Sequence, residues 1–107
     1  MDSAILSALA EPNRLMMVEL LQRGPLSVGD IAEQLQMRQP QVSKHLRVLL
    51  EAGVVEFETD ANRRIYGLRM EPFHKMDAWL EPYRPLWGAN LDGLNHYLHQ
   101  LQNKPKP

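Results

Sequence analysis

The chain has 107 residues, the size of one small domain, and its apolar content of 44% is ordinary for a globular fold. It contains no cysteine, so disulfides, thiol redox switches and thiolate metal sites are excluded. The net charge of −1 argues against a general polyanion binder, but a protein that reads DNA needs only a local basic patch. We expect a single domain over residues 1–107.

The beginning of the chain, MDSAILSALAEP, lacks the basic head and long apolar run of a secretory signal. No later stretch approaches the roughly 20 apolar residues that span a bilayer. We therefore expect an intracellular, cytoplasmic protein without a membrane partner. A chain this short buries a smaller share of its apolar surface than a large one, and such chains are often completed by a partner. Dimerisation is therefore a question that this chain raises.

The first part of the chain predicts two short helices. One runs from Asp2 to about Leu9, with Asp2 or Ser3 as its cap. The next begins at Pro12, a favoured residue of the first turn, and stops at Gly24. Apolar side chains point in almost every direction around this second helix, so we expect it to be the central core helix, surrounded by other elements. These side chains are Leu15, Met16, Met17, Val18, Leu20 and Leu21.

Two further helices predict a helix-turn-helix over about residues 28–52. Ser27 precedes Asp30 by three residues, a capping-box-like start, and the helix behind it runs from about Val28 to Leu35. After a short link, RQPQVSKHLRVLLEAG has a proline in its first turn and ends on Gly53, which suits a left-handed cap. This fourth helix has one apolar stripe, formed by Val42, Leu46, Leu49 and Leu50.

Behind this helix the hydrophobic period changes to two, which predicts strands. Val55 and Phe57 alternate with acidic residues, and a polar turn at Ala61 and Asn62 leads to a second apolar run. A hairpin over about residues 54–69, directly after a helix-turn-helix, is the order of elements in a winged helix. The expected fold is therefore mainly α with a small β-hairpin: four helices, two strands and a C-terminal helix.

The last part, about residues 72–102, is helical in pattern with a break or kink near Glu81, because Pro82 and Pro85 fit best in the first turn of a new helix. Two surfaces are candidates to be covered by the apolar residues of this segment: its own domain and a second copy of the chain. The number of these residues favours a homodimer, with the first helix also part of the interface. Such a symmetric homodimer places its two recognition helices about 34 Å apart, which is one turn of DNA. It therefore predicts an operator that is an inverted repeat. The assigned interface residues are Ile5, Leu6, Leu80, Tyr83, Trp87, Leu91, Leu94, Leu98 and Leu101.

The outward side of the fourth helix carries hydrogen-bonding and basic side chains. Glutamine and serine read base edges in the major groove, while lysine and arginine reach guanine or phosphate. The free amides at the helix start suit a phosphate, and arginines near the hairpin tip have a phosphate or minor-groove target. The predicted DNA-binding residues are Arg38, Gln39, Gln41, Ser43, Lys44, Arg47, Asn62, Arg63 and Arg64.

Three segments, ALAEPNRLMMVELL, LSVGDIAEQLQMRQPQVSKHLRVLLEAGVVE and NRRIYGL, resemble the ArsR/SmtB family of bacterial winged-helix repressors. The resemblance implies a homodimer that represses transcription by binding operator DNA, and its own promoter is a candidate operator. The continuation WLEPYRPLWGANLDGLNHYL is similar to an autorepressor-like subgroup that does not sense metals. The family's frequent Ser-x-His-Leu-x-x-Leu-x-x-Ala-Gly run is matched by Ser43, His45, Leu46, Leu49, Ala52 and Gly53.

The metal sites of the family are matched only in part. Metal-sensing members often carry a Cys-Val-Cys segment, and the matching positions here are Ser27 and Gly29, so that sensor is absent. Asp92, His96 and His99 lie at helical spacing and could bind zinc, but they also read as polar residues beside a leucine stripe. We expect no cofactor, and a metal-responsive repressor stays an alternative.

The sequence does not indicate an enzyme. Ser43 and His45 lie two residues apart on a helix and point in different directions, so they cannot act as nucleophile and base. His45 is expected to pack at the flank of its helix or to touch phosphate. The alternative function is a winged helix that associates with a protein partner. The acidic strand residues Glu56, Glu58 and Asp60 are the observation that supports this alternative. The sequence does not identify an inducer.

Overall fold

The computed structural model of the protein describes residues 1–87 and 98–102. The chain divides into two compact units, Met1–His74 and Lys75–Pro107, and the expectation of one domain over the whole chain stays a prediction. Within the described residues, no helix is long and apolar enough to cross a membrane. The elements are α1 (Ser3–Ala10), α2 (Pro12–Leu21), β1 (Leu26–Ser27), α3 (Val28–Leu35), α4 (Gln39–Glu51), β2 (Val55–Asp60), β3 (Arg63–Leu68) and α5 (Glu71–Leu80), followed by the 3-10 helix η1 (Glu81–Leu86).

Local sequence signals begin and end these helices where they were predicted. The Asp2 carboxylate accepts a hydrogen bond from the amide of Ala4 at 2.9 Å and caps α1. Ser27 Oγ accepts from the amide of Asp30 at 3.1 Å and caps α3. Beyond α4, Gly53 has a φ of 77°, a left-handed conformation that disfavours any residue with a side chain. The predicted helix-turn-helix is therefore present with its predicted caps.

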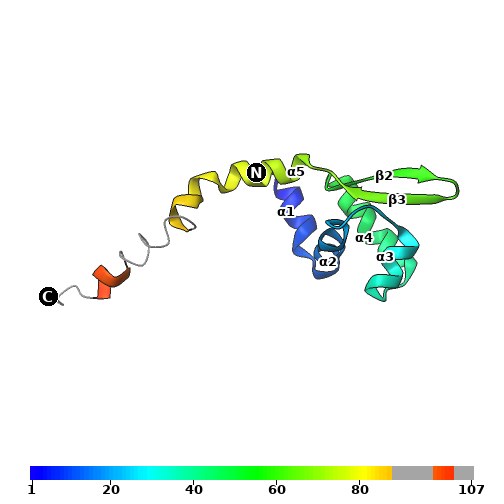
Figure 1. Cartoon of the computed structure of the whole chain (residues 1–107), viewed down its shortest axis with the longest axis horizontal. Coiled ribbons are helices and arrows are strands. Elements are labelled where there is room, and N and C mark those ends of the chain that lie inside the picture. Colours follow the sequence, from blue (N-terminus) through cyan, green and yellow to red (C-terminus); the bar gives the residue numbers. More distant parts are fainter. Residues whose placement is uncertain (88–97, 103–107) are drawn as a thin grey trace. The chain divides into compact units, whose positions relative to one another are not determined.

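The sheet is antiparallel and has three strands in the order β1-β3-β2. The predicted hairpin is confirmed, and Figure 1 shows it extending away from the helices of the first unit. The additional strand β1 was not predicted, because two residues are too few to show an alternating pattern. β2 lies at the edge of the sheet, where Glu56, Glu58 and Asp60 are exposed.

The core lies between α1–α4 and the sheet. The predicted stripe of α4 is confirmed, since Val42, Leu46 and Leu49 are fully buried and Leu50 packs against them. The side chains that form the core are Ile5, Ala8, Met17, Val18, Leu21, Ile31, Ala32, Val42, Leu46, Leu49, Val54, Val55 and Tyr66.

The prediction that α2 is surrounded on all sides is wrong. Met17 is fully buried, but Leu15 and Met16 are each 43% exposed. The reason is that α1, α3, α4 and β3 all contact α2 but leave these two side chains partly uncovered. An apolar run that points in every direction does not require that every direction be covered within one chain.

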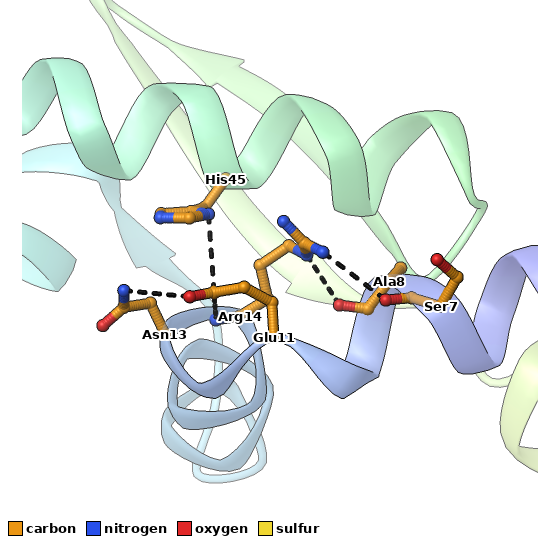
Figure 2. Close-up of polar contacts among 6 residues, drawn as sticks. All are labelled: Ser7, Ala8, Glu11, Asn13, Arg14 and His45. Atoms are coloured by element: carbon orange, nitrogen blue, oxygen red, sulfur yellow. Dashed lines mark hydrogen bonds and ion pairs between the residues drawn. The ribbon is translucent and has the colours of Figure 1, made fainter.

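A polar network joins α1, α2 and α4 where α1 meets α2 (Figure 2). The Glu11 carboxylate caps α2 by accepting from the amide of Arg14 at 2.9 Å, and it also accepts from the Asn13 side chain at 3.1 Å. Arg14 Nε donates to the carbonyl oxygen of Ala8 at 2.6 Å, near the end of α1. His45 Nδ1 lies 3.7 Å from Glu11 Oε2, so His45 does more than pack at the flank of α4.

The pKa of Glu11 lies below its ordinary value of 4.5, chiefly because the Arg14 amide donates to the charged form. Burial raises this pKa, whereas the charge of His45, the hydrogen bond from Asn13 and the charge of Arg14 lower it further. A carboxyl group whose pKa is lowered by folding stabilises the fold above its ordinary pKa. That stabilisation is lost as the pH falls through the folded-state pKa.

Beyond α5, the predicted break near Glu81 is confirmed, because the α-helix ends at Leu80. The next element is a 3-10 helix with Pro85 inside it rather than the expected α-helix start. Residues 98–102 are helical. The predicted interface residues Leu91 and Leu94 lie outside the described residues.

Replacing Glu11 with Gln tests the acid sensitivity of this corner. Gln keeps an oxygen that can cap α2 but has no charge to lose, so wild type should be more stable than Glu11→Gln above pH 4.5, with the difference shrinking at lower pH. Urea unfolding followed by circular dichroism across the acid range measures this difference. A difference that is the same at every pH would contradict the assignment.

Replacing Leu46 with Ala tests the core position of α4. Because Leu46 is fully buried, the substitution should lower the free energy of unfolding by about 2–5 kcal/mol. Leu15→Ala is the matched control, since this leucine is 43% exposed and should lose much less. Equal losses in urea unfolding of the two variants would contradict the difference in burial between these two leucines.

Candidate nucleic-acid interface

The outward side of α4 forms the first part of the candidate interface. Gln41, Lys44 and Arg47 are exposed on the side opposite the buried stripe. Together with Pro40 and Ser43 they line a shallow groove of about 410 Å³. Arg47 Nε lies 3.3 Å from the carboxylate of Glu51, but both side chains are largely exposed, so this pair contributes little and does not prevent Arg47 from turning to a phosphate.

A second, larger groove of about 670 Å³ joins α3, α4 and the hairpin. It brings together predicted DNA-binding residues that are far apart in the sequence, from the start of α4 and from the hairpin tip. Ser43 lines both grooves, so the two form one continuous surface. The larger groove is lined by Ser27, Val28, Gly29, Asp30, Glu33, Gln39, Ser43, Asn62, Arg63 and Arg64.

Asp30 and Glu33 are groove residues that sequence reasoning missed. They lie one helical turn apart on α3, and this spacing could have placed them on one face, but nothing in the sequence showed which face looks toward the hairpin. Their carboxylates repel phosphate but can accept hydrogen bonds from the amino group of cytosine. The groove therefore contains both acidic and basic side chains, unlike a uniformly basic groove that binds only the phosphate backbone.

The two arginines of the hairpin tip are held differently. The Arg64 guanidinium lies 4.6 Å from the ring centroid of Phe57, which in turn packs on Tyr66 with 5.3 Å between ring centroids. This stacking orients Arg64 and leaves the N–H groups at its edge able to donate. Arg63 pairs in register with Asp60, and because neighbouring residues of a strand point to opposite faces, the two arginines leave the hairpin on different sides.

Arg38 stands at the N-cap of α4 and is exposed, but its side chain makes no capping hydrogen bond. An N-cap of this kind leaves amides of the first turn without a side-chain acceptor. Pro40 carries no amide hydrogen, so the donors come from its neighbours. This arrangement suits an anion, and a phosphate beside Gln39 stays a prediction.

The family model for bacterial regulatory proteins of the arsR family matches residues 11–56. The crystal structure of the ArsR family transcriptional regulator RHA00566 is 32% identical, has a TM-score of 0.68, and is matched over 79% of this chain and 88% of that chain. The chain belongs to the ArsR family. The finer resemblance to an autorepressor-like subgroup stays a prediction.

Two further relatives place this ArsR-family chain among regulators. A biofilm growth-associated repressor of Agrobacterium fabrum is 42% identical over 64 residues, which are 60% of this chain and 55% of that protein. The homodimeric winged helix-turn-helix DNA-binding domain Mb0332 of Mycobacterium bovis is 26% identical with a TM-score of 0.65 over 78% of each chain. The predicted winged helix-turn-helix is confirmed, while the predicted C-terminal dimerisation helix stays a prediction, and these are names of regulators rather than enzymes. The chain spans little more than half the length of the curated relatives it matches, such as the A. fabrum repressor.

The residues predicted to join two copies of this ArsR-family chain differ in exposure. Ile5 is 3% exposed because it packs in the core of its own chain, so it leaves no surface for a second copy and its assignment is corrected. Leu6, next to it, is 44% exposed. Leu80 is half-buried. Besides Leu6, the exposed residues of the predicted interface that the structure describes are Tyr83, Trp87, Leu98 and Leu101.

The metal alternative rests on residues that the structure describes only in part. Within residues 1–87 and 98–102, no group of three or more His, Asp or Glu side chains could hold a metal ion. Asp92 and His96 lie outside these ranges, and only His99 of the proposed set is described. A zinc site in this ArsR-family chain stays a hypothesis.

Proposed function

We propose that the protein is a sequence-specific DNA-binding repressor of transcription that acts as a homodimer on an inverted-repeat operator. The observation that carries this proposal is the continuous surface that runs from the outward side of α4, through Ser43, to the arginines of the hairpin. A reader of duplex DNA needs this combination, because one helix must reach base edges while a second element contacts the backbone. The name of the A. fabrum relative supports repression.

In this proposal the start of α4 enters the major groove. Gln41 and Ser43 read base edges, and Lys44 reaches guanine or phosphate. The wing, which is the β2–β3 hairpin, contacts the neighbouring backbone or minor groove. Arg64 is oriented in advance by Phe57, so less side-chain entropy is lost when it binds.

The homodimer is supported by apolar surface in both units. In the second unit, the Trp79 and Tyr83 rings pack at 5.3 Å between centroids, yet these residues are 43% and 44% exposed. Leu86 and Trp87 add side chains that are 61% and 41% exposed, and exposed apolar side chains gathered in one segment are typical of an association surface. In the first unit, Leu6 supplies exposed apolar surface on α1. The M. bovis relative is described as homodimeric.

Operator binding is tested with DNA that the protein selects from a random pool. We expect the selected fragment to be an inverted repeat, and its affinity to fall at least about tenfold between low and moderate salt, because several phosphates are neutralised. Lys44→Ala and Arg63→Ala should each weaken binding and make the salt slope shallower by about 1. Gel retardation at several salt concentrations measures all three effects, and the gene's own promoter is the first natural fragment to try.

The control for charge is Arg23→Ala, an exposed arginine at the end of α2 that lines neither groove. It should bind the selected fragment as wild type does, and all variants should melt at the wild-type temperature. Unchanged binding by both Lys44→Ala and Arg63→Ala would contradict the contact surface. Protein capture in pull-downs, with no DNA preference, would instead favour the protein-association alternative.

The oligomeric state is tested by light scattering at micromolar concentration. We expect twice the chain mass of 12.3 kDa for wild type. Trp87→Ser should weaken the dimer, because it removes an aromatic side chain that is 41% exposed in the single chain. Val48→Ser, a change at a 37% exposed position on the outward side of α4, should leave the mass unchanged. A monomeric wild type would contradict the homodimer.

A further inference from the structure

The apolar stripe of α4 fixes how deeply this helix sits in the core, but it defines the rotation of the helix about its own axis less sharply. Apolar burial is non-directional, and its free energy depends mainly on the area removed from water. A small rotation of α4 would keep most of this burial. The outward side chains lie about 5–6 Å from the helix axis, so a rotation of about 10° moves them by about 1 Å. Hydrogen bonds to base edges do not tolerate such a shift.

His45 is placed where it can define this rotation. It follows the outward Lys44 and precedes the buried Leu46, so its side chain leaves α4 at the flank, and it is 20% exposed. From there its Nδ1 reaches to 3.7 Å from Glu11 Oε2, at the beginning of α2. Such a contact is directional, since its strength depends on the distance between the two atoms and therefore on the rotation of α4.

The partner of His45 is itself held rigidly. Glu11 Oε2 accepts from the amide of Arg14, and Oε1 accepts from the Asn13 side chain, so both carboxylate oxygens are fixed (Figure 2). The Arg14 guanidinium is engaged by the carbonyl oxygens of Ser7 and Ala8 in α1, at 3.4 and 2.6 Å. His45 therefore contacts a carboxylate that is held by two hydrogen bonds from α2, and the Arg14 side chain joins the same part of α2 to α1.

We propose that Glu11 and His45 are a positioning pair that fixes the rotation of α4 about its axis and thereby the preference of the protein for its operator over other DNA. The inference rests on the proposed DNA-binding function. The affinity for DNA in general and the preference for one sequence depend on different contacts. Phosphate contacts tolerate a small shift and set the affinity for any DNA, whereas base contacts set the preference.

The test compares the dissociation constants for two DNA fragments of equal length, the fragment that wild type selects from random DNA and a scrambled version of it. Their ratio is the sequence preference. We expect Glu11→Gln and His45→Ala each to lower this ratio about fivefold, mainly by weakening binding to the selected fragment. The double variant should lose no more than the worse single variant, because the two residues act as one pair.

Two variants separate pairing from charge and from packing. Glu19→Gln removes the same charge from an exposed position of α2 and should keep the wild-type ratio. His45→Gln keeps a donor that can reach the Glu11 carboxylate and should recover part of the ratio that His45→Ala loses. Thermal melting shows which variants fold. If His45→Ala does not fold, Glu11→Gln still tests the proposal.

Three results would overturn the positioning pair. They are a wild-type ratio in both Glu11→Gln and His45→Ala, an equal loss of affinity for both fragments, and no recovery in His45→Gln. These results leave the proposed function intact, since wild type would still select its fragment. A wild-type protein that selects no sequence overturns the proposed function, and the positioning pair with it.

Discussion

The structure depends on the burial of one side of α4. Val42, Leu46 and Leu49 are fully buried, and each lies about one turn from the next, so this helix has one side that belongs to the core and another that is left for a ligand. Removing such side chains from water is the main source of stability in a domain of this size. The same burial orients the polar side of α4 outward, and the stability of the core and the exposure of the reading surface are consequences of one arrangement.

The other elements of the first unit complete this arrangement. α3 holds the beginning of α4 through a short link, and the sheet places the wing beside it, so both grooves of the candidate interface meet at Ser43. The polar corner of Glu11, Arg14 and His45 adds direction to a packing that is otherwise apolar. Most of the stability therefore comes from the apolar stripe, whereas the orientation of α4 is the part that we assign to Glu11 and His45.

Much of this could be predicted from the sequence, because the decisive signals are local. The caps at Asp2 and Ser27, the left-handed Gly53 and the change of period after α4 each act within a few residues. What could not be predicted depends on contacts between distant segments. The two residues of β1 become a strand only because β3 lies beside them, and the exposure of Leu15 depends on which side of α2 its neighbours cover.

The candidate site shows the same division. The outward residues of α4 follow from helical periodicity, but the placement of Asp30 and Glu33 in the groove follows from how α3 meets the wing. The contact of His45 with Glu11, 34 positions earlier in the chain, likewise has no local signature. Sequence patterns assign each residue to a side of its own helix, and the tertiary fold decides what that side faces.

The acidic residues of β2 have a consequence for the solubility of the protein. An edge strand offers unpaired backbone donors and acceptors, and a protruding hairpin offers them where another chain can reach them most easily. Glu56, Glu58 and Asp60 give this edge a row of like charges, and two copies that approached edge to edge would bring these charges together. The wing can therefore stand clear of the core without recruiting further strands into a growing sheet.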